Sequence, residues 1–373
     1  MSHVPTGQRR LILPLIFFLS LIILQEKSEV RPFFNMTHQR SGEQPKALAN
    51  SVLCFARHID ALHKLGPLAA QIVNKHVALQ VKPEHYPIVG EYLLRSIREV
   101  LGPQVATDDV IDAWGAAYGM LANILIAAEG DMYNTLAAAP GGWRGDRKFT
   151  IAKKVQETPD VTSFYLSPVD KKEVLVNAPG QYLTLIATVN GESIRRNYSV
   201  SDACDGKGYR ISVKKIAGGA FSEYLHSLPE GAELNVCAPT GEFTLAAEST
   251  RPVVLVSAGV GVTPMISMAK AAAAKKRGVT HIHFTKNDKT NEVKTLGNIE
   301  GVTRHVIETE GKNYHDNGDA LLGAMGSAIE GDAEIYIVGP GSFMRTVAHA
   351  LKKKGTNMDN VKFEFFGSNQ NLF

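Results

Sequence analysis

The stretch Arg196-Asn197-Tyr198-Ser199 places a cation, an aromatic ring and a hydroxyl within four consecutive residues. If it forms a strand, Arg196 and Tyr198 point to one face and Asn197 to the other, because alternate strand residues share a face. A guanidinium makes paired hydrogen bonds to a pyrophosphate, and a hydroxyl reaches a ring edge. We interpret the stretch as a seat for a flavin, although the four residues taken alone also suit an ordinary exposed strand.

Two glycine-containing segments follow at positions that suit phosphate binding. Gly218 and Gly219 precede an amphipathic segment, 221–226, and leave the first N–H groups of that helix open to a phosphate. The apolar run 252–257 is typical of a buried parallel strand and leads into Gly259-Val260-Gly261-Val262-Thr263-Pro264. The order predicts a strand, a turn and a helix that bind a nucleotide, although the third glycine of the G-x-G-x-x-G fingerprint is absent.

The order of these segments, with Pro179-Gly180-Gln181-Tyr182 before them, resembles the ferredoxin-NADP reductase-like family. Tyr336-Ile337-Val338-Gly339-Pro340 and Glu364-Phe365-Phe366-Gly367 match that family as well. The resemblance implies a six-stranded antiparallel barrel that binds FAD and an α/β domain that binds NAD(P)H, with Phe366 over the flavin face and Glu364 near the ring. The cofactor-binding residues that it implies are Tyr182, Arg196, Asn197, Tyr198, Ser199, Gly218, Gly219, Ser222, Gly259, Val260, Gly261, Val262, Thr263, Pro264, Glu364, Phe365, Phe366, Gly367 and Ser368.

Helical periodicity dominates the chain from Met36 to Asn134, where apolar residues recur at intervals of three and four. Ser41-Gly42-Glu43-Gln44 has the form of a capping box and predicts the start of a helix. His76 faces the apolar side of its helix, and periodicity alone favours a core residue over a metal ligand there. These lengths suit a bundle around a large cofactor, with further helices at about Leu68–Leu79, Tyr86–Val100 and Asp108–Ala128.

Several segments of this helical part closely resemble the globin domain of flavohemoglobins. They are Phe33-Phe34-Asn35-Met36, Gln39-Arg40, Asn74-Lys75-His76, Lys82-Pro83-Glu84-His85-Tyr86, Gly90-Glu91 and Asp112-Ala113-Trp114-Gly115-Ala116-Ala117-Tyr118. The resemblance extends from Phe33 to Phe373 and implies that His76 is the proximal ligand of haem b, with Lys75 as a further cofactor contact. It also implies that Tyr86 and Glu129 support His76.

The physical sense of that support is direct, because a hydrogen bond from the imidazole Nδ1 makes the ring a stronger donor to iron. Without the resemblance, Glu129 suits a solvated carboxylate at a helix end, and Tyr86 suits the edge of an amphipathic core. On the distal side, Gln44 and Leu48 match the family's pocket residues and Phe34 matches its haem-wedging aromatic. Helix capping alone also explains Gln44. The family's distal tyrosine is missing, because Ser20 stands at its place.

The N-terminal segment departs from the family's first two helices. Arg9-Arg10 is followed by an apolar run, 11–24, which is shorter than the ~20 residues of a spanning helix. It is nearer a signal-peptide core but has no small-x-small cleavage site. We favour a replaced or mispredicted first exon over an unusual signal or anchor, or a diverged helix pair, because secretion would separate the protein from cytosolic NADH. We expect a cytoplasmic protein that does not associate with membranes.

Composition sets the outer limits of the interpretation. The chain has 373 residues, 44% of them hydrophobic, and a net charge of +3, which indicates no nucleic-acid surface. Cys54, Cys204 and Cys237 form no Cys-x-x-Cys pair, which favours a reducing compartment. We expect a monomer with an atypical segment at 1–32, a globin at 33–138 lacking its normal first helices, an FAD-binding barrel at 146–249 and an NAD(P)-binding domain at 250–373.

The segment 281–290 is the last irregularity. His281 and His283 alternate with Ile282 as on a half-buried strand, and the following loop is shorter than in the family, which leaves NADH versus NADPH open. The full resemblance implies nitric oxide dioxygenation, in which NAD(P)H, FAD and a globin haem convert NO and O₂ to nitrate. Two alternatives stay open: an NAD(P)H flavin diaphorase or ferric reductase with a remnant globin, and a haem-based gas sensor.

Overall fold

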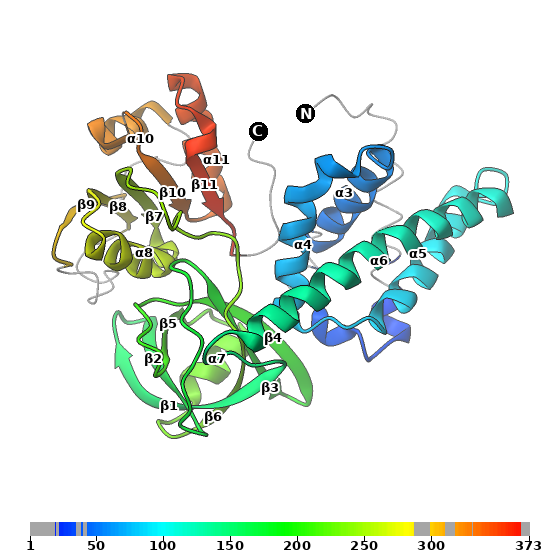
Figure 1. Ribbon diagram of the computed structural model, residues 1–373, viewed down its shortest axis with the longest axis horizontal. Coiled ribbons are helices and arrows are strands. Elements are labelled where there is room, and N and C mark those ends of the chain that lie inside the picture. The colour runs from blue at the N-terminus through cyan, green and yellow to red at the C-terminus, as the bar shows by residue number, and fades with distance from the viewer. Residues whose placement is uncertain are drawn as a thin grey trace. The chain divides into compact units, whose positions relative to one another are not determined.

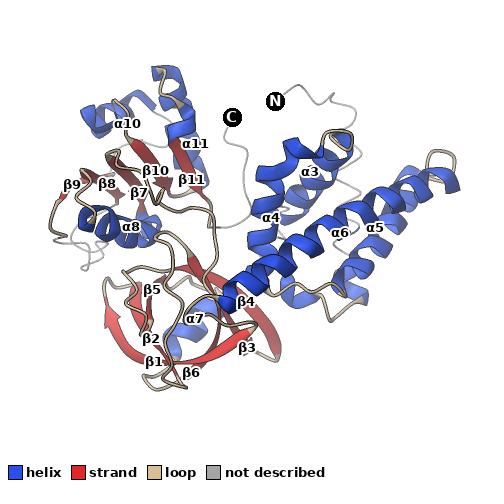
Figure 2. Cartoon of the chain, in the orientation of Figure 1, coloured by secondary structure: helices blue, strands red, loops and turns tan. Residues whose placement is uncertain are grey.

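The computed structural model describes residues 19, 22–34, 39, 43–286, 299–309, 318–329 and 331–366, with the side chains of 43–47, 49 and 50 left out. The chain forms two compact units. The first contains the described residues up to Ala137 together with Glu192–Arg195, and the second contains Ala138–Gly191 and the described residues of Arg196–Phe366. Together they show a helical domain, an antiparallel barrel and a parallel-sheet domain, as the sequence predicts (Figures 1 and 2).

The first unit is helical, and its helices begin and end where turn-forming residues stand. Pro67 lies in the first turn of α4, and α4 ends where Gln80 adopts a left-handed conformation. Helix α6 is longer than predicted, because Gly130 does not end it, just as Gly115 and Gly119 do not interrupt it earlier. The elements are η1 (Arg31–Phe33), α3 (Glu43–Arg57), η2 (Leu62–Leu65), α4 (Gly66–Leu79), α5 (His85–Leu101) and α6 (Asp108–Ala138) (Figure 1).

The end of the N-terminal apolar run belongs to the helical core. Residues 22–26 are helical, and Leu19, Ile22 and Ile23 are buried against α5 residues that include Leu93. Glu26 holds the segment at its polar side, because it accepts a hydrogen bond from Tyr92 Oη at 2.8 Å. The sequence set residues 1–32 apart from the globin, whereas the described part of this segment packs within the helical unit, since its apolar side chains fill space beside α5.

Helix α6 is, among the described residues, the one helix long and apolar enough to cross a membrane by length and composition. Several of its side chains are buried within the helical unit, namely Ala122, Leu125, Glu129 and Tyr133. Glu129 and Tyr133 hydrogen-bond to groups on neighbouring segments. By length and composition alone, a helix of a globular domain passes the same criteria, and 11% of the apolar window of α6 is buried.

The second unit begins with a six-stranded antiparallel sheet in the order β4-β3-β6-β1-β2-β5. The β3–β4 hairpin turns at Asn190-Gly191, and both residues have positive φ, as a type I′ turn requires. A bridge between Val200 and Ile211 joins the chain beyond β4 to β5, so the two edges of the sheet approach each other. The elements are β1 (Asp146–Gln156), β2 (Val161–Pro168), β3 (Tyr182–Val189), β4 (Glu192–Ser199), β5 (Tyr209–Lys214), α7 (Ala220–Ser227) and β6 (Glu233–Cys237).

A five-stranded parallel sheet follows, in the order β11-β10-β7-β8-β9. One apolar cluster packs α8 against residues such as Leu255 and Val338, and another packs α10 and α11 against the opposite face. Strands β7, β8 and β10 are therefore buried on both faces, as the apolar run of β7 predicts, whereas the edge strands β9 and β11 are only partly buried. The elements are β7 (Val253–Ala258), η3 (Gly259–Gly261), α8 (Val262–Ala274), β8 (Val279–Thr285), β9 (Val302–Glu308), α10 (Gly318–Met325), η5 (Gly326–Ile329), β10 (Glu334–Val338), α11 (Gly341–Lys354), η6 (Met358–Asn360) and β11 (Val361–Glu364).

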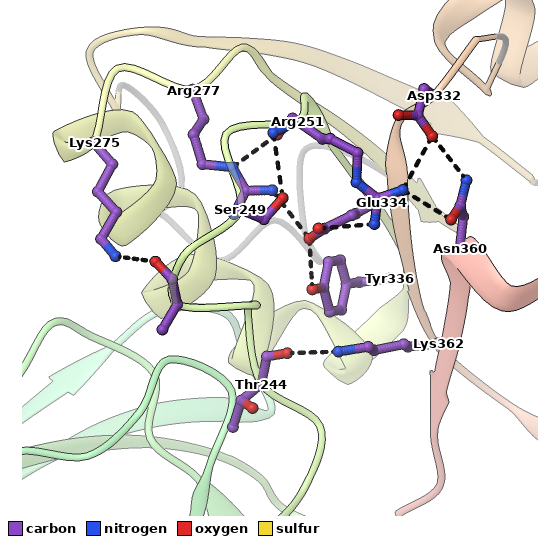
Figure 3. A network of polar contacts seen from close by, with 11 residues as sticks. Thr244, Ser249, Arg251, Lys275, Arg277, Asp332, Glu334, Tyr336, Asn360 and Lys362 are labelled. Atoms are coloured by element: carbon purple, nitrogen blue, oxygen red, sulfur yellow. Dashed lines mark hydrogen bonds and ion pairs between the residues drawn. The ribbon is translucent and has the colours of Figure 1, made fainter.

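A polar network fixes the segment before β7 to the start of β10 (Figure 3). Glu334 accepts hydrogen bonds from Arg277 and Arg251, both at 3.0 Å, and from Tyr336 Oη at 3.0 Å. The side chains of Glu334 and Arg277 are each 3% exposed, so this is a buried ion pair. Burial alone raises the pKa of Glu334, but the hydrogen bonds from Ser249, Arg277 and Tyr336 outweigh it and lower that pKa to about 2.

Candidate functional site

The predicted haem-binding residues of α4, α5 and α6 meet inside the helical unit. His76 Nδ1 lies 2.7 Å from Glu129 Oε1 and 3.0 Å from Tyr86 Oη, and Tyr86 Oη donates to the same Glu129 oxygen at 2.5 Å. Tyr118 Oη donates to the backbone oxygen of Tyr86 at 2.8 Å and so holds the start of α5. Three residues that are far apart in sequence thus form one hydrogen-bonded cluster.

The hydrogen bonds of this cluster run toward Glu129, because Tyr86 keeps its proton. Burial raises the pKa of Tyr86 far above its ordinary value, and the hydrogen bond to Glu129 adds to the rise. Tyr86 therefore stays a protonated donor at physiological pH. Glu129 is 2% exposed and receives a second donor in His76 Nδ1–H. A histidine that carries its proton on Nδ1 presents a lone pair at Nε2, which is the state a metal-ligating imidazole requires.

The cluster fits haem, since it supplies an imidazole with one oriented nitrogen and a carboxylate behind it. The side chain of His76 is 34% exposed, which leaves its other nitrogen accessible to a ligand. Lys75 precedes it on α4 and is half-buried. Phe34 and Leu48 both pack against the apolar cluster around Tyr92 and so lie in one part of the helical unit. Gln44 begins α3, but its side chain lies outside the described residues, as do Ser41 and Ser20.

We expect Glu129→Gln to lower the NO consumption that the family resemblance implies about 10- to 100-fold, because the amide keeps an acceptor for His76 but removes the negative charge behind it. The same loss of charge should raise the reduction potential of the bound haem. Both are measured on the haem- and FAD-loaded protein, by an NO electrode and by spectroelectrochemistry. Glu91→Gln, at an exposed position of α5, is the matched control. An unchanged potential would contradict the assigned role of Glu129.

The predicted flavin seat lies on β4 with its residues arranged as the strand pattern requires. Arg196 and Tyr198 are two residues apart, and each affects the pKa of the other. Burial is the larger effect for both, since it lowers the pKa of Arg196 and raises that of Tyr198. Asn197 accepts a hydrogen bond from Thr184 Oγ1 at 2.9 Å on the neighbouring strand, and Ser199 ends β4.

Gly218 and Gly219 directly precede α7, which packs an aromatic ring against Tyr198. The rings of Tyr198 and Phe221, the latter in α7, are 6.1 Å apart. Ser222 Oγ accepts from the backbone N–H of Ile216 at 3.1 Å and closes the turn before α7. Gly218 has a φ of +70°, and its N–H donates to Glu223 at 2.9 Å, so the helix supplies its own acceptor for that group.

Residues from the end of the chain come close to this site. Burial raises the pKa of Tyr182, and the carboxylate of Glu364, on β11, adds to the rise. Phe365 packs against the apolar core of the nucleotide domain, whereas Phe366 is 51% exposed. Gly367 and Ser368 lie outside the described residues. The structure thus places Glu364 near Tyr182 and leaves the ring of Phe366 accessible.

The predicted nucleotide turn joins β7 directly to α8. Gly259, Val260 and Gly261 form a single 3-10 turn, and Thr263 Oγ1 donates to Val260 O at 3.1 Å. A Cβ on Gly261 would lie 2.5 Å from Val338 O, so the turn touches the end of β10 at a distance only glycine permits. The following residues of the site, Val262, Thr263 and Pro264, are buried at the start of α8.

The histidines of β8 are more deeply buried than the sequence indicated. His281 and His283 are each 1% exposed, and both lie 2.8 Å from Ser257 Oγ on β7. Burial lowers the pKa of His281 well below its ordinary value and that of His283 to about 4, so both rings are neutral at physiological pH. The expectation of a half-buried strand was wrong, because α8 covers this face of the sheet.

Sequence reasoning did not find the residues that join α8 to the barrel. Ser267 Oγ accepts a hydrogen bond from the N–H of Gly180 at 3.2 Å, and Lys270 Nζ donates to Asp202. The only signal in the sequence is that Ser267 and Lys270 are polar residues in an otherwise apolar helix. Nothing in the spacing identifies their partners, which are more than sixty residues away.

Two known protein families match parts of this chain. The globin family matches residues 22–125, and the oxidoreductase FAD-binding domain family matches residues 148–245. The flavohemoprotein of Pseudomonas putida is 48% identical over 362 residues, which cover 93% of this chain and 91% of that protein. The flavohemoprotein of a Burkholderia species is 47% identical and covers 92% and 91%.

Solved structures agree. The crystal structure of flavohemoglobin from Malassezia yamatoensis, with bound FAD and heme, is 25% identical with a TM-score of 0.83, covering 96% of this chain and 95% of that one. The FAD/NAD-binding domain of nitric oxide dioxygenase from Vibrio cholerae is 31% identical with a TM-score of 0.50, covering 59% and 98%. Because the Pseudomonas and Burkholderia proteins align with this chain over nearly their whole length, the chain belongs to the flavohemoprotein family.

Proposed function

We propose that this protein is a nitric oxide dioxygenase that uses haem b, FAD and NAD(P)H to convert NO and O₂ to nitrate. The observation that carries the proposal is the His76–Glu129–Tyr86 cluster, in the same chain as a flavin seat and a nucleotide turn. Bound haem supplies O₂ binding and one-electron chemistry, while bound FAD splits the electron pair of NAD(P)H into single electrons. These are the parts the reaction needs.

The chain's own residues orient the groups and tune them. His76 would hold the iron through Nε2, and Glu129, which lies 2.7 Å from His76 Nδ1, would increase electron donation from the imidazole. Tyr86 fixes Glu129 in position. Arg196 is suited to the pyrophosphate and Tyr198 to the face of the flavin ring. Gly261 brings the nucleotide turn against β10, where the first N–H groups of α8 suit the phosphates of NAD(P)H.

The experiment is a turnover assay on the full chain loaded with haem and FAD. We expect NO consumption that requires both NAD(P)H and O₂. It should yield about two nitrate ions per NAD(P)H, because one NO and one O₂ together take up one electron to form nitrate and NAD(P)H supplies two. Reduction of ferricyanide without NO consumption would instead indicate a diaphorase. Haem that binds gas without turnover would indicate a sensor. Assays with NADH and NADPH in parallel would establish the preference, since residues 287–298 lie outside the described part.

We also propose that the protein acts as a cytoplasmic monomer. The support for the compartment is that Cys54, Cys204 and Cys237 form no disulfide, as expected in a reducing compartment where NAD(P)H is supplied. Size-exclusion chromatography with light scattering and fractionation of cells test these two statements separately. A mass of twice the chain, or recovery with membranes, would contradict them.

A further inference from the structure

One face of α8 contacts the barrel at three separate places. Ile266 packs with Val161, at the start of β2, in a small buried cluster. Ser267 accepts from the N–H of Gly180, just before β3. Lys270 pairs with Asp202, just after β4. Lys270 follows Ile266 by four residues and Ser267 by three, so the three side chains lie on one side of the helix, which carries an apolar contact, a neutral hydrogen bond and a charged contact.

The contact at Gly180 tolerates no side chain. Gly180 has a φ of +105°, and a Cβ there would lie 2.0 Å from Phe243 O and 2.5 Å from the Cε of Met268 in α8. The backbone conformation and the close approach of the Phe243 carbonyl therefore require glycine, whereas Met268 Cε is the end of a flexible side chain. The segment before β3 contacts α8 through the hydrogen bond from the Gly180 N–H to the Ser267 hydroxyl.

The Lys270–Asp202 pair differs from an ordinary surface ion pair because a second cation, the buried Arg210, also binds Asp202. Arg210 Nη1 lies 3.3 Å from Asp202 Oδ2, and the Arg210 side chain is only 2% exposed. The same guanidinium donates to the backbone oxygen of Ser201 and, through Nε, to Ser201 Oγ at 3.3 Å. A buried guanidinium needs such partners, so Asp202 is oriented independently of Lys270.

A line of buried serines supports Arg210 in turn. Ser201 Oγ lies 2.8 Å from Ser212 Oγ, which lies 2.8 Å from Ser163 Oγ. Ser163 donates to Glu157 at 2.6 Å, and Glu157 is 2% exposed. This line crosses β5 and β2 inside the barrel, so Arg210, which binds Asp202, is itself anchored to buried hydrogen-bonded groups.

Helix α8 starts directly after the Gly259–Gly261 turn. A rigid helix whose one face is fixed to the barrel also fixes the position of the turn that precedes it. We propose that Lys270, through Asp202, and Ser267, through Gly180, are positioning residues that set bound NAD(P)H against the flavin. This inference rests on the proposed function only for the identity of the two cofactors. It predicts that loss of Lys270 slows flavin reduction more than it weakens nucleotide binding.

The test is rapid-mixing reduction of the flavin by NAD(P)H in the full, haem- and FAD-loaded chain. We expect Lys270→Met, which keeps the length but removes the charge, to lower the limiting rate of flavin reduction about ten- to a hundredfold, since small misplacements of reacting groups have effects of that size. The dissociation constant of NAD(P)H should change less than threefold. Lys270→Arg should restore most of the rate. The matched control is Lys353→Met, in an exposed pair with Asp319.

A charge exchange gives a second test. In Asp202→Lys with Lys270→Asp, the new lysine would face Arg210, so we expect no recovery of the rate. If Lys270 and Asp202 formed only an isolated surface ion pair, this charge exchange would restore the rate of flavin reduction. The inference is overturned if NAD(P)H reduces the flavin of the Lys270→Met protein at the wild-type rate. It is also overturned if a slower rate in that protein is explained by loss of FAD or by lower thermal stability. Wild-type protein whose flavin NAD(P)H does not reduce would instead contradict the proposed function.

Discussion

We expect the His76→Ala protein to purify with FAD but without tightly bound haem, and to lose NO consumption by at least about a thousandfold. Reduction of ferricyanide by NAD(P)H should stay within twofold of wild type, because the flavin and nucleotide residues belong to the second unit. The measurements are the haem and flavin absorbance per chain, the NO electrode trace and the ferricyanide rate. The effect is the largest we predict, since one nitrogen atom of His76 is the iron ligand that the described residues of the proposed site supply.

The physical reason for so large an effect lies in the arrangement behind His76. Glu129 is 2% exposed and accepts from both His76 Nδ1 and Tyr86 Oη, so the ring has one orientation. Alanine removes the iron ligand and one of the two donors to a buried carboxylate, which adds a stability cost of about 1–3 kcal/mol.

The matched control is His63→Ala, because His63 is an exposed histidine of the same unit, in η2. It should keep wild-type haem content and NO consumption. Full haem content in His76→Ala with normal NO turnover would contradict the assignment of the ligand. Loss of both haem and FAD would point to unfolding, and circular dichroism of the variant separates that outcome from a specific loss.

Glu334→Gln should lower the free energy of unfolding by about 3–5 kcal/mol, because removing one partner of a buried ion pair leaves the other charge uncompensated. The uncompensated charge is that of Arg277, whose side chain is 3% exposed (Figure 3). Urea unfolding followed by fluorescence measures the change. The same substitution at Glu233, a half-exposed residue paired with Lys148, is the control and should cost less than about 1 kcal/mol.

The pH dependence has a definite sign. The pKa of Glu334 is lowered to about 2 from an ordinary 4.5, so the folded state favours the charged carboxylate. Its contribution to stability is therefore fully present above about pH 4.5 and is lost as the pH falls toward 2. The stability difference between wild type and Glu334→Gln should shrink over that range. A difference that is constant from pH 7 to pH 3 would contradict the ion-pair explanation.

For several site residues, the local sequence predicted the strand, turn or helix on which they lie. Residues 196 and 198 lie on one strand, the Gly259–Gly261 turn joins a buried strand to a helix, and His76 lies on the inner face of α4. These features depend on strand alternation, glycine conformation and helical spacing, which neighbouring residues determine. The length of α6 and the burial of His281 and His283 were misjudged, because both depend on what packs around them.

Local backbone preferences and the pattern of apolar residues predicted the helical, antiparallel and α/β parts and the glycine turns, whereas the family resemblance implied that His76 is a ligand supported by Glu129. The tertiary structure shows that Glu129 does meet His76 Nδ1, and it alone decided that the end of the N-terminal apolar run packs beside α5 and that Lys270 meets an aspartate held by a buried arginine. The reason is that such contacts join residues tens of positions apart. The packing of whole helices and sheets sets which of these residues meet. A local stretch of sequence contains no information on the distance between residues so far apart in the chain.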